Sequence, residues 1–402
     1  KVKTKGQNEG DKLLVPKLRF KEFKDNYMKH KLSEVVDFYK GNILSKSDII
    51  EGGKTPCILY GELYTRYSEI AYEIFSFTNN SNSNLFYSKK NDILIPCSGE
   101  TALDISTSTC VLSDNIAIGG DLNVLRSKDQ SGKYLSYLLN HKKRLEIAKY
   151  AQGDSIVHLY ANKIRNINMY LPSYMEQEKI ANLLSLLDKK IELQKQKIDA
   201  LKIYKKGLIS HIFNGIHSTK KLKNIVNFQN GKSYENLVDI TGNYNLISLN
   251  SITIDGKLNK FMKKIKSDLP ISTLNKNDIV MIMSDVGHGD FLGVSAIIPN
   301  DNVYVLNQRV GLLRIKDNTI PSYLLYAINN LQPYFKKYGQ GSSQLNLSKE
   351  DILNANIPYI DIHSQEDLSN FCILFDKKIF NAEFKLENLK NLKKSLLQQM
   401  FI

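Results

Sequence analysis

The chain has 402 residues, enough for two ordinary domains that each bury a core. Its 55 Lys and Arg residues outnumber its 41 Asp and Glu residues, so the formal charge is +14, which favours a polyanionic partner such as nucleic acid or an acidic membrane surface. Only seven of the basic residues are Arg, and an AT-rich genome would also enrich Lys, Asn, Ile and Tyr. The charge therefore selects no function by itself.

Cysteine spacing and hydropathy exclude several classes of protein. The four cysteines show no paired spacing and the seven histidines are spread singly, so we expect neither a disulfide framework nor a metal site. No stretch of 18 apolar residues lacks a charge, and residues 1–12 are basic and polar, without the apolar segment of a signal peptide. We therefore expect a soluble cytoplasmic protein with no membrane partner and no cofactor of its own.

One pattern occurs twice along the chain, at offsets of 186 to 190 residues. The copies open at residues 31–41 and 221–231, each beginning with Lys-Leu and ending with Gly after an apolar alternation that predicts a first strand and a turn. Asn-Asp-Ile, at residues 91–93 and 277–279, then leads into an apolar run that predicts a buried strand.

The match continues to the end of each copy. Leu-Arg, at residues 125–126 and 313–314, ends another strand-like stretch. An amphipathic helix is predicted from Tyr134 and from Tyr323, and a Gln-Gly pair follows each helix as a stop signal.

After Pro172 and Pro358 the apolar period becomes helical without interruption. Apolar residues recur at alternating steps of four and three, the spacing of a coiled-coil seam, with polar exceptions at Gln194, Lys205 and Lys393. Matching seams predict that the two helices pack on each other; the alternative is that each covers only its own domain. The seam residues we predict are Leu184, Leu187, Ile191, Ile198, Leu201, Lys205, Leu208, Cys372, Phe375, Ile379, Leu386, Leu389, Lys393 and Leu396.

An antiparallel helix pair would relate the copies by a pseudo-two-fold axis and hold their globular domains apart. Ile180 to Ile212 spans roughly 48 Å at a rise of 1.5 Å per residue. B-DNA repeats its major groove every ~34–36 Å, so a rigid spacer of this length suits two readers on one duplex. Because the copies diverge between their matching strands, the predicted target is double-stranded DNA with two different half-sites and an unread gap.

The residues that open the chain and the first long helix resemble a known family, the specificity subunits of Type I restriction-modification enzymes. Copy two departs from the family pattern with Ser-Gln-Glu-Asp-Leu at residues 364–368 in place of the usual Glu-Gln step. The resemblance rests on Pro16-Lys17-Leu18-Arg19-Phe20, Phe23, Lys31-Leu32-Ser33-Glu34-Val35, Leu171-Pro172, Glu176-Gln177, Ile180-Ala181, Leu184, Asp188 and Ile191.

This resemblance implies an α+β fold with two β-rich target recognition domains, each followed by a long helix, the helices pairing as an antiparallel coiled coil with pseudo-two-fold symmetry. It also implies a non-catalytic subunit that docks two adenine-N6 methyltransferase subunits, which use S-adenosylmethionine, and through them motor and nuclease subunits that use ATP and Mg. The divisions we predict are a tail at residues 1–16, recognition domains at 17–172 and 216–360, and spacer helices at 173–215 and 361–402.

Three short stretches imitate catalytic or cofactor motifs without completing them. Asn-Ile-Pro-Tyr at residues 356–359 differs by one residue from an adenine methyltransferase motif, and we predict a turn before the second long helix. Gly-Lys-Ser at 231–233 has Val226 where a P-loop requires Gly, and the glycines at 287–293 lack dinucleotide-binding spacing.

Candidate DNA contacts are expected in loops that differ between the copies, because bases are read by Arg, Lys, Asn and Gln while phosphates are held by Lys, Ser and Asn. Arg66 is the favoured base contact of the first domain, and Gln308–Arg309 is the favoured base contact of the second. The first domain has Gly120–Asp121 at the position of Gln308–Arg309, so the charge there is opposite in the two domains. The candidates are Asn42, Ser45, Lys46, Tyr60, Tyr64, Arg66, Tyr67, Asp121, Lys232, Ser233, Tyr234, Asn236, Gln308 and Arg309.

Two other functions stay open at this point. One is a nuclease or methyltransferase with its own active site, which would act as a purified chain. The other is a coiled-coil scaffold that does not bind DNA, in which case the positive charge reflects genome composition alone.

Overall fold

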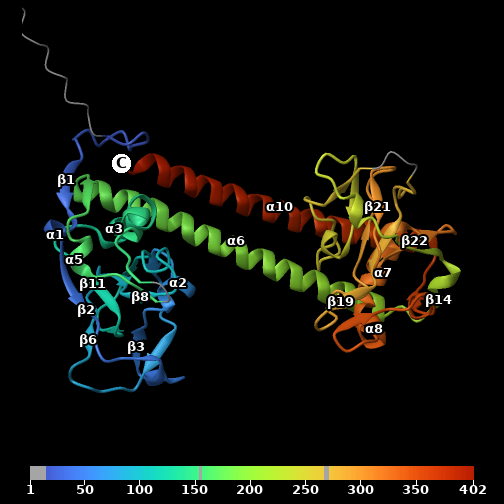
Figure 1. Ribbon diagram of the computed structural model, residues 1–402, viewed down its shortest axis with the longest axis horizontal. Helices are drawn as coiled ribbons and strands as arrows, with labels where there is room; N and C mark the ends of the chain where they lie inside the picture. Colours follow the sequence, from blue (N-terminus) through green and yellow to red (C-terminus); the bar gives the residue numbers. More distant parts are fainter. Residues whose placement is uncertain (1–14, 154–155, 267–270) are drawn as a thin grey trace, which may run out of the picture. The chain divides into compact units, whose positions relative to one another are not determined.

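The computed structural model describes residues 15–153, 156–266 and 271–402. Contacts divide the chain into two compact units, unit 1 (Lys1–Lys195 with Lys385–Ile402) and unit 2 (Gln196–Phe384). Each unit holds one β-rich globular domain together with part of each of two long helices, α6 (Tyr174–Asn214) and α10 (Ile362–Met400) (Figure 1).

The globular domain of unit 1 contains two main sheets. The larger has the order β2-β11-β7-β9-β4, in which only β9 and β4 run parallel. The smaller has the order β5-β3-β10-β6, and the pairs β1–β13 and β8–β12 lie beside them. The bounds are β1 Met28–Lys31, β2 Val36–Lys40, β3 Thr55–Ile58, β4 Ile70–Ala71, β5 Ser76–Thr78, β6 Phe86–Tyr87, β7 Ile93–Pro96, β8 Ser98–Gly99, β9 Thr109–Val111, β10 Ala117–Ile118, β11 Leu122–Ser127, β12 Val157–His158 and β13 Asn168–Leu171.

Short helices cover the larger sheet of unit 1. All four residues of β7 are buried, as its unbroken apolar run requires, and α3 packs across β7 and β9 with Tyr134 and Tyr137 fully buried. Ile180 and Leu184 of α6 and Leu397 of α10 join the same core, so the long helices are part of the domain's packing. The helices are α1 Leu32–Val35, α2 Glu62–Thr65, α3 Gly132–Leu138, α4 Arg144–Ala148 and α5 Ala161–Ile164, with a 3-10 turn at Lys46–Asp48 and a π-helical turn at Leu139–Lys143.

Unit 2 repeats this topology. Its sheet β15-β22-β18-β20 corresponds to β2-β11-β7-β9, its sheet β17-β16-β21 to β5-β3-β10, and its pairs β14–β24 and β19–β23 to β1–β13 and β8–β12. The equivalent parallel contacts, β16–β21 and β3–β10, are also kept. The strands are β14 Thr219–Lys221, β15 Val226–Asn230, β16 Tyr244–Ile247, β17 Lys264–Ile265, β18 Ile279–Ile282, β19 Ser284–Val286, β20 Ser295–Ile297, β21 Tyr304–Leu306, β22 Val310–Ile315, β23 Gln344–Asn346 and β24 Asn356–Pro358.

The helices of unit 2 cover its sheet as in unit 1. α7 packs on β20, and Phe213 of α6 contacts Tyr323 of α7 at a ring distance of 5.5 Å inside the core. The helices are α7 Pro321–Asn330, α8 Gln332–Tyr338 and α9 Lys349–Leu353, with 3-10 turns at Leu222–Asn224, Glu235–Leu237 and Leu249–Ser251.

The two matching motifs of the sequence form one repeated contact. In unit 1 the Arg126 guanidinium, at the end of β11, donates to the buried Asp92 carboxylate at 2.9 and 2.8 Å. In unit 2 Arg314 donates to Asp278 at 2.8 and 2.6 Å. A bidentate pair fixes both position and angle, so the Asn-Asp-Ile and Leu-Arg motifs lock one strand against its neighbour in each domain.

Several predicted elements have different bounds in the structure. The predicted first strand begins late, because α1 and the equivalent 3-10 turn occupy residues 32–35 and 222–224 before β2 and β15 start. The predicted single amphipathic helix is broken in both domains, by the π-helical turn in unit 1 and between α7 and α8 in unit 2. The expected turn at residues 356–359 is largely strand β24, paired with β14.

The glycines predicted to stop the helices lie at different distances from the helix ends. Gly339 directly follows α8 as its C-cap, whereas Gly153 and Gly341 lie further on, with φ of +125° and +129° in the turns after α4 and α8. A Cβ at either position would approach a backbone carbonyl oxygen to 2.1 Å, so only glycine fits both sites.

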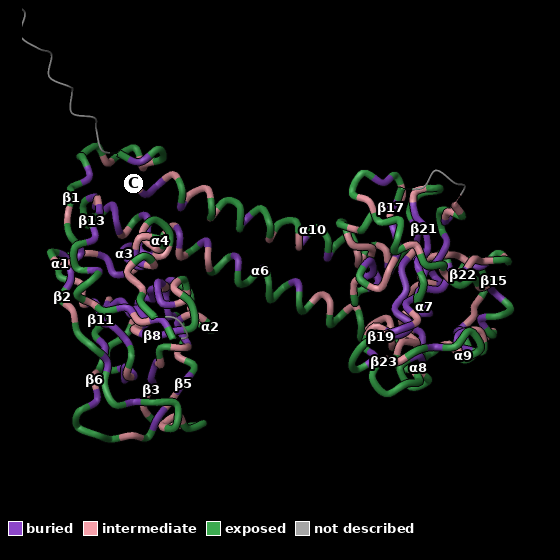
Figure 2. Tube along the Cα trace, in the orientation of Figure 1, coloured by how far each residue is buried: buried purple, intermediate pink, exposed green. Residues whose placement is uncertain are grey.

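Within each unit the parts of α6 and α10 lie side by side and antiparallel. In unit 1, Leu187 and Ile191 of α6 cluster with Leu389 of α10. In unit 2, Lys202 pairs with Glu383 and Lys205 with Asp376, so contacts move down α10 as they move up α6. Buried and exposed residues alternate along both helices, as a two-helix seam requires (Figure 2). Among the described residues, no helix is apolar over a length that would cross a membrane.

Candidate DNA-recognition loops and helix spacer

The seam position that carries Lys in both copies is an ion-pair site. In unit 1, Lys393 on α10 lies 2.7 Å from the Asp188 carboxylate on α6. In unit 2, Lys205 on α6 lies 2.6 Å from the Asp376 carboxylate on α10. The two lysines are 188 residues apart in the sequence, and so are the two aspartates. The second ion pair therefore repeats the first, except that the lysine lies on α6 and the aspartate on α10. The two lysines among the polar exceptions in the predicted seam are therefore paired charges.

A tyrosine completes this site in each unit. Tyr137 donates to Asp188, and Tyr326 donates to Asp376 at 2.6 Å. The lysine lies over the tyrosine ring, 5.6 Å from its centre in unit 1 and 5.2 Å in unit 2. Burial raises the pKa of both phenols, and the neighbouring Asp raises it further, so each hydroxyl stays a donor. The repeated Lys-Asp-Tyr sites fasten the globular domain to the helix pair.

Unit 1 adds two groups that sequence reasoning missed. The Glu69 carboxylate lies 3.1 Å from Lys393 and 2.6 Å from the Nε2 atom of His141. Burial alone would raise the pKa of Glu69, but the His141 hydrogen bond and the Lys393 charge outweigh it and lower that pKa to about 2. Burial opposes the charge on Lys393, yet Glu69 and Asp188 raise its pKa. The spacer is thus held to the first domain by a larger ionic network than to the second.

The predicted seam residues are all buried or half-buried. Leu184, Leu187, Ile191, Cys372 and Ile379 are each at most 8% exposed. The half-buried seam residues are Leu201, Lys205, Leu208, Phe375, Leu386, Lys393 and Leu396, and the buried ones also include Ile198 and Leu389.

The start of each long helix is fixed by one glutamine. The Gln177 side-chain oxygen accepts the Ser131 N–H at 3.1 Å, and the Gln365 oxygen accepts the Ile320 N–H at 3.0 Å. Each amide nitrogen then donates to the carbonyl five residues before it, at 2.9 and 2.8 Å. Both copies therefore keep this function of the family signature, including copy two, where Ser364 replaces the glutamate.

That replacement has a local cause. In unit 1 the fully buried Glu176 receives two hydrogen bonds from Arg19, both at 2.8 Å, and lies beside the Tyr27 hydroxyl. The Arg19 segment also donates a backbone hydrogen bond from Leu18 to Gln399 of α10. The sequence of copy two has no second segment of this kind, so a glutamate there would be buried without its arginine.

The candidate loops of each domain converge in space although they are far apart in sequence. In unit 1, Asn42 donates a backbone hydrogen bond to Ile118, and Gly120 donates one to Leu44, so the loop after β2 lies against the loop before β11. In unit 2, Lys232 donates to Leu306 in the same way. These paired loops form an exposed edge in each domain.

Asp121 and Arg309 occupy the same backbone position in the two domains. Both have left-handed backbones, with φ of +58° and +69°, directly before β11 and β22. Their carbonyls accept equivalent hydrogen bonds, from the Cys97 N–H at 2.7 Å and the Met283 N–H at 3.0 Å. Both side chains are exposed, so the same frame presents opposite charges in the two units.

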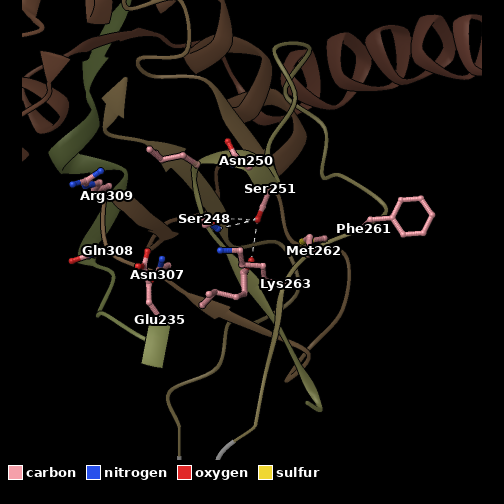
Figure 3. Close-up of a pocket in the computed structure, with 12 residues that line it drawn as sticks. Glu235, Ser248, Asn250, Ser251, Phe261, Met262, Lys263, Asn307, Gln308 and Arg309 are labelled. Carbon is pink, nitrogen blue, oxygen red and sulfur yellow. Dashed lines mark hydrogen bonds between the residues drawn. The ribbon is translucent and has the colours of Figure 1, made fainter. Parts of the chain in front are cut away.

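Gln308 and Arg309 lie at the edge of a pocket of about 360 Å³ in unit 2 (Figure 3). Its lining is mainly polar, and the Tyr234 N–H donates to the Asn307 side chain at 3.2 Å beside it. Sequence reasoning missed the residues of the opposite wall, because they lie about 50 residues earlier in the chain and join Arg309 only through the sheet β17-β16-β21. The missed lining residues include Ser248, Asn250, Ser251, Phe261, Met262 and Lys263.

In unit 1 the structure brings only part of the predicted aromatic-basic cluster together. Arg66 lies over the Phe75 ring at 6.0 Å and contacts Glu62 at 3.4 Å, and Tyr67 lies 5.3 Å from the same ring. Phe75 and Glu62 were not predicted. Arg66 remains about half exposed, so it can still reach a ligand.

The other candidates are dispersed around these loops. Tyr60 is exposed, and Tyr64 turns toward Gly61 and Gly99. Ser45 caps the 3-10 turn by contacting Asp48 at 2.9 Å, which accounts for it structurally. The remaining exposed candidates are Asn42, Lys46, Lys232, Ser233 and Asn236. The described residues contain no group of three His, Cys, Asp or Glu side chains with metal-site geometry.

Two domains of one fold, with matched frames, differing exposed loops and shared helix contacts, define a duplicated recognition protein with a helical spacer. The chain belongs to the family described as Type I restriction modification DNA specificity domain, which matches residues 24–202 and 217–398. Proteins of this family are the non-catalytic specificity subunits of Type I restriction-modification systems, and this chain is a DNA-specificity subunit with two target recognition domains.

Known relatives match most of the chain. The MjaVIII specificity subunit of a Type I restriction enzyme from Methanocaldococcus jannaschii is 24% identical over 387 residues, which cover 86% of this chain and 88% of the relative. The MjaX subunit of that organism, named as putative, is 22% identical over 66% of each chain. The crystal structure of the Type I S subunit from M. genitalium has the same fold, with a TM-score of 0.62, 19% identity and coverage of 96% of this chain and 99% of that one.

Proposed function

We propose that the chain reads an asymmetric, bipartite DNA target, with residues 17–172 recognising one half-site and residues 216–360 the other. The main support for this proposal is that Asp121 and Arg309 occupy equivalent backbone positions in the two domains and expose opposite charges there. Arg suits guanine or phosphate, whereas a carboxylate accepts from cytosine and repels phosphate. Two domains that differ in this way select different sequences.

Residues 173–215 and 361–402 serve as the spacer in this proposal. The Lys-Asp-Tyr site fastens each domain to its part of the helix pair, so that helices, not a flexible linker, connect the two readers. The unread gap of the DNA target is the stretch of duplex that lies between the two half-sites.

The helices also carry a repeated apolar surface suited to partner subunits. Leu186 and its equivalent Leu374 are 67% and 63% exposed, and Leu392 and its equivalent Tyr204 are 49% and 60% exposed. In unit 2 Tyr204 belongs to an aromatic row, because its ring lies 5.8 Å from Phe375, which lies 5.1 Å from Phe371. Exposed apolar residues repeated in both units support two equivalent docking sites.

The partners that fit these two sites are two methyltransferase subunits in a cytoplasmic complex. S-adenosylmethionine then belongs to those subunits, and ATP and Mg to motor and nuclease subunits recruited through them. This chain supplies DNA specificity and geometry to the assembly.

The direct test is co-expression with the methyltransferase subunit encoded beside this chain, followed by mapping of modified adenines across a genome. We expect one motif with two short specified parts and a constant gap. Methylation without a sequence motif, or a motif without a gap, would refute the proposal.

The docking sites can be tested separately by stoichiometry. L186S should reduce a complex with two methyltransferase subunits to one, measured by native mass spectrometry, and L186S with L374S should abolish assembly. L193S is the matched control, because Leu193 is 56% exposed on the same helix but its repeat equivalent is Asn381. Unchanged stoichiometry in the double variant would rule out these sites.

A further inference from the structure

One aromatic side chain of unit 2 projects into solvent almost completely. Phe261 is 96% exposed, and Figure 3 shows its ring pointing away from the other residues around the pocket. The neighbouring Met262 is half buried against the core. A fully hydrated phenyl ring is unfavourable, so a ligand that buried this ring would gain stability from the contact.

The loop that carries Phe261 is held on both sides of the tip. The Asn259 N–H donates to the Ser251 carbonyl at 2.9 Å, and the Lys263 carbonyl accepts from the Leu246 N–H at 2.8 Å. Ile265, two residues further on, is fully buried in β17. The ring is therefore presented by a fixed backbone, which lowers the entropy lost when a ligand covers it.

The surroundings of the ring are basic. Lys260, Lys263 and Lys264 are exposed next to it in sequence, and Arg309 lines the same pocket as Phe261. Glu235 is the acidic residue of that pocket lining. An aromatic tip between lysines is complementary to stacked bases between phosphates, not to an apolar protein surface.

The equivalent position in unit 1 has a different arrangement. Strands β3 and β5 correspond to β16 and β17, and their registers place Ile74 at the position of Phe261 and Phe75 at the position of Met262. Ile74 is partly buried against the core, and Phe75 is 48% exposed with Tyr67 and Arg66 against its ring. The first domain therefore packs an isoleucine where the second exposes a phenylalanine.

We propose that Phe261 is a wedge that inserts between two adjacent base pairs in the half-site read by unit 2. Its lysine neighbours hold the flanking phosphates, and Arg309 contacts the duplex from the other edge of the pocket. The inserted ring unstacks one base step, bends the duplex there, and makes recognition of that half-site depend on how easily the step deforms. This inference rests on the proposed DNA-reading function.

The test uses the complex with its methyltransferase subunits and a duplex of the mapped target. 2-Aminopurine is placed singly along the second half-site, leaving out the methylated adenine, because the methyltransferase flips that base. We expect wild-type protein to raise fluorescence at one step, F261A to abolish the rise and weaken binding about 10- to 100-fold, and F261W to retain both.

Ile240 supplies a matched control. It is 93% exposed in the same unit but follows Asp239 rather than lysines, so I240A should leave fluorescence and affinity unchanged. Specific binding by wild type and F261A alike, with no unstacked step in either, would overturn the wedge while leaving the DNA-reading function intact. Loss of sequence-specific binding by the wild type would instead refute the proposed function.

Discussion

The two domains agree in their internal contacts and differ in the residues that their loops expose. Arg126–Asp92 and Arg314–Asp278 lock the same strands, and Gln177 and Gln365 fix the same helix starts. At the exposed edge, Asp121 faces solvent in one domain and Arg309 in the other. Duplication has therefore preserved the contacts that build the frame, while the exposed loops have been free to diverge.

The helix pair shows a second difference between the units. Lys393 in unit 1 contacts both Asp188 and Glu69, whereas Lys205 in unit 2 contacts Asp376. The first domain is therefore fastened to the spacer by more charge pairs. Substitutions at equivalent positions should have unequal effects in the two units.

The largest effect is expected from L187D combined with F375D. Leu187 is 7% exposed in the seam of unit 1, and Phe375 lies in an aromatic cluster in unit 2. Each new carboxylate would be placed where the helices meet, at a cost of about 3 kcal/mol or more. Both helix contacts should open and methyltransferase assembly should be lost, measured by co-purification. Retained assembly would contradict the spacer account.

The next largest effect is expected on the unfolding free energy of K393A, which should lose more stability than K205A. K393A leaves the buried Glu69 and the 18% exposed Asp188 without their cation and should cost about 3–5 kcal/mol of unfolding free energy. K205A leaves Asp376, which is 27% exposed, and should cost about 1–3 kcal/mol. Thermal unfolding of both variants measures the difference, and equal losses would show that the Glu69 network adds nothing.

The effect expected at Glu69 depends on pH. Its pKa falls from 4.5 to about 2 on folding, because His141 and Lys393 outweigh the opposing effect of burial. A carboxyl with a lowered pKa contributes stability above its unfolded pKa and loses it as pH falls toward the folded value. The stability difference between wild type and E69Q should be on the order of 3 kcal/mol near neutrality and should shrink between pH 4.5 and 2. A difference that stays constant across this range would contradict the assignment.

The sequence predicted the strands and long helices better than the side chains that meet at the candidate DNA-recognition loops, for physical reasons. Helix seams and buried strands follow from apolar periodicity, which is local, so α6, α10, β7 and β18 could be predicted. The break between α3 and α4 could not, because it depends on tertiary packing.

The reading surface depends on contacts between distant segments. Glu62 and Phe75 meet Arg66, and Phe261 shares a pocket with Arg309, only after the sheets have formed. Arg309 could be proposed as a DNA contact from the sequence because its register equivalent, Asp121, has the opposite charge, and this contact stays a prediction. Phe261 gave no such signal, since exposure is a property of the folded loop.

The central claim is that each domain reads its own half-site. The most direct measurement replaces residues 31–155 with the same segment of a divergent relative, co-expresses the hybrid with the methyltransferase subunit, and maps modified adenines. One half of the motif should change while the other half and the gap stay the same. A motif altered in both halves would contradict the account.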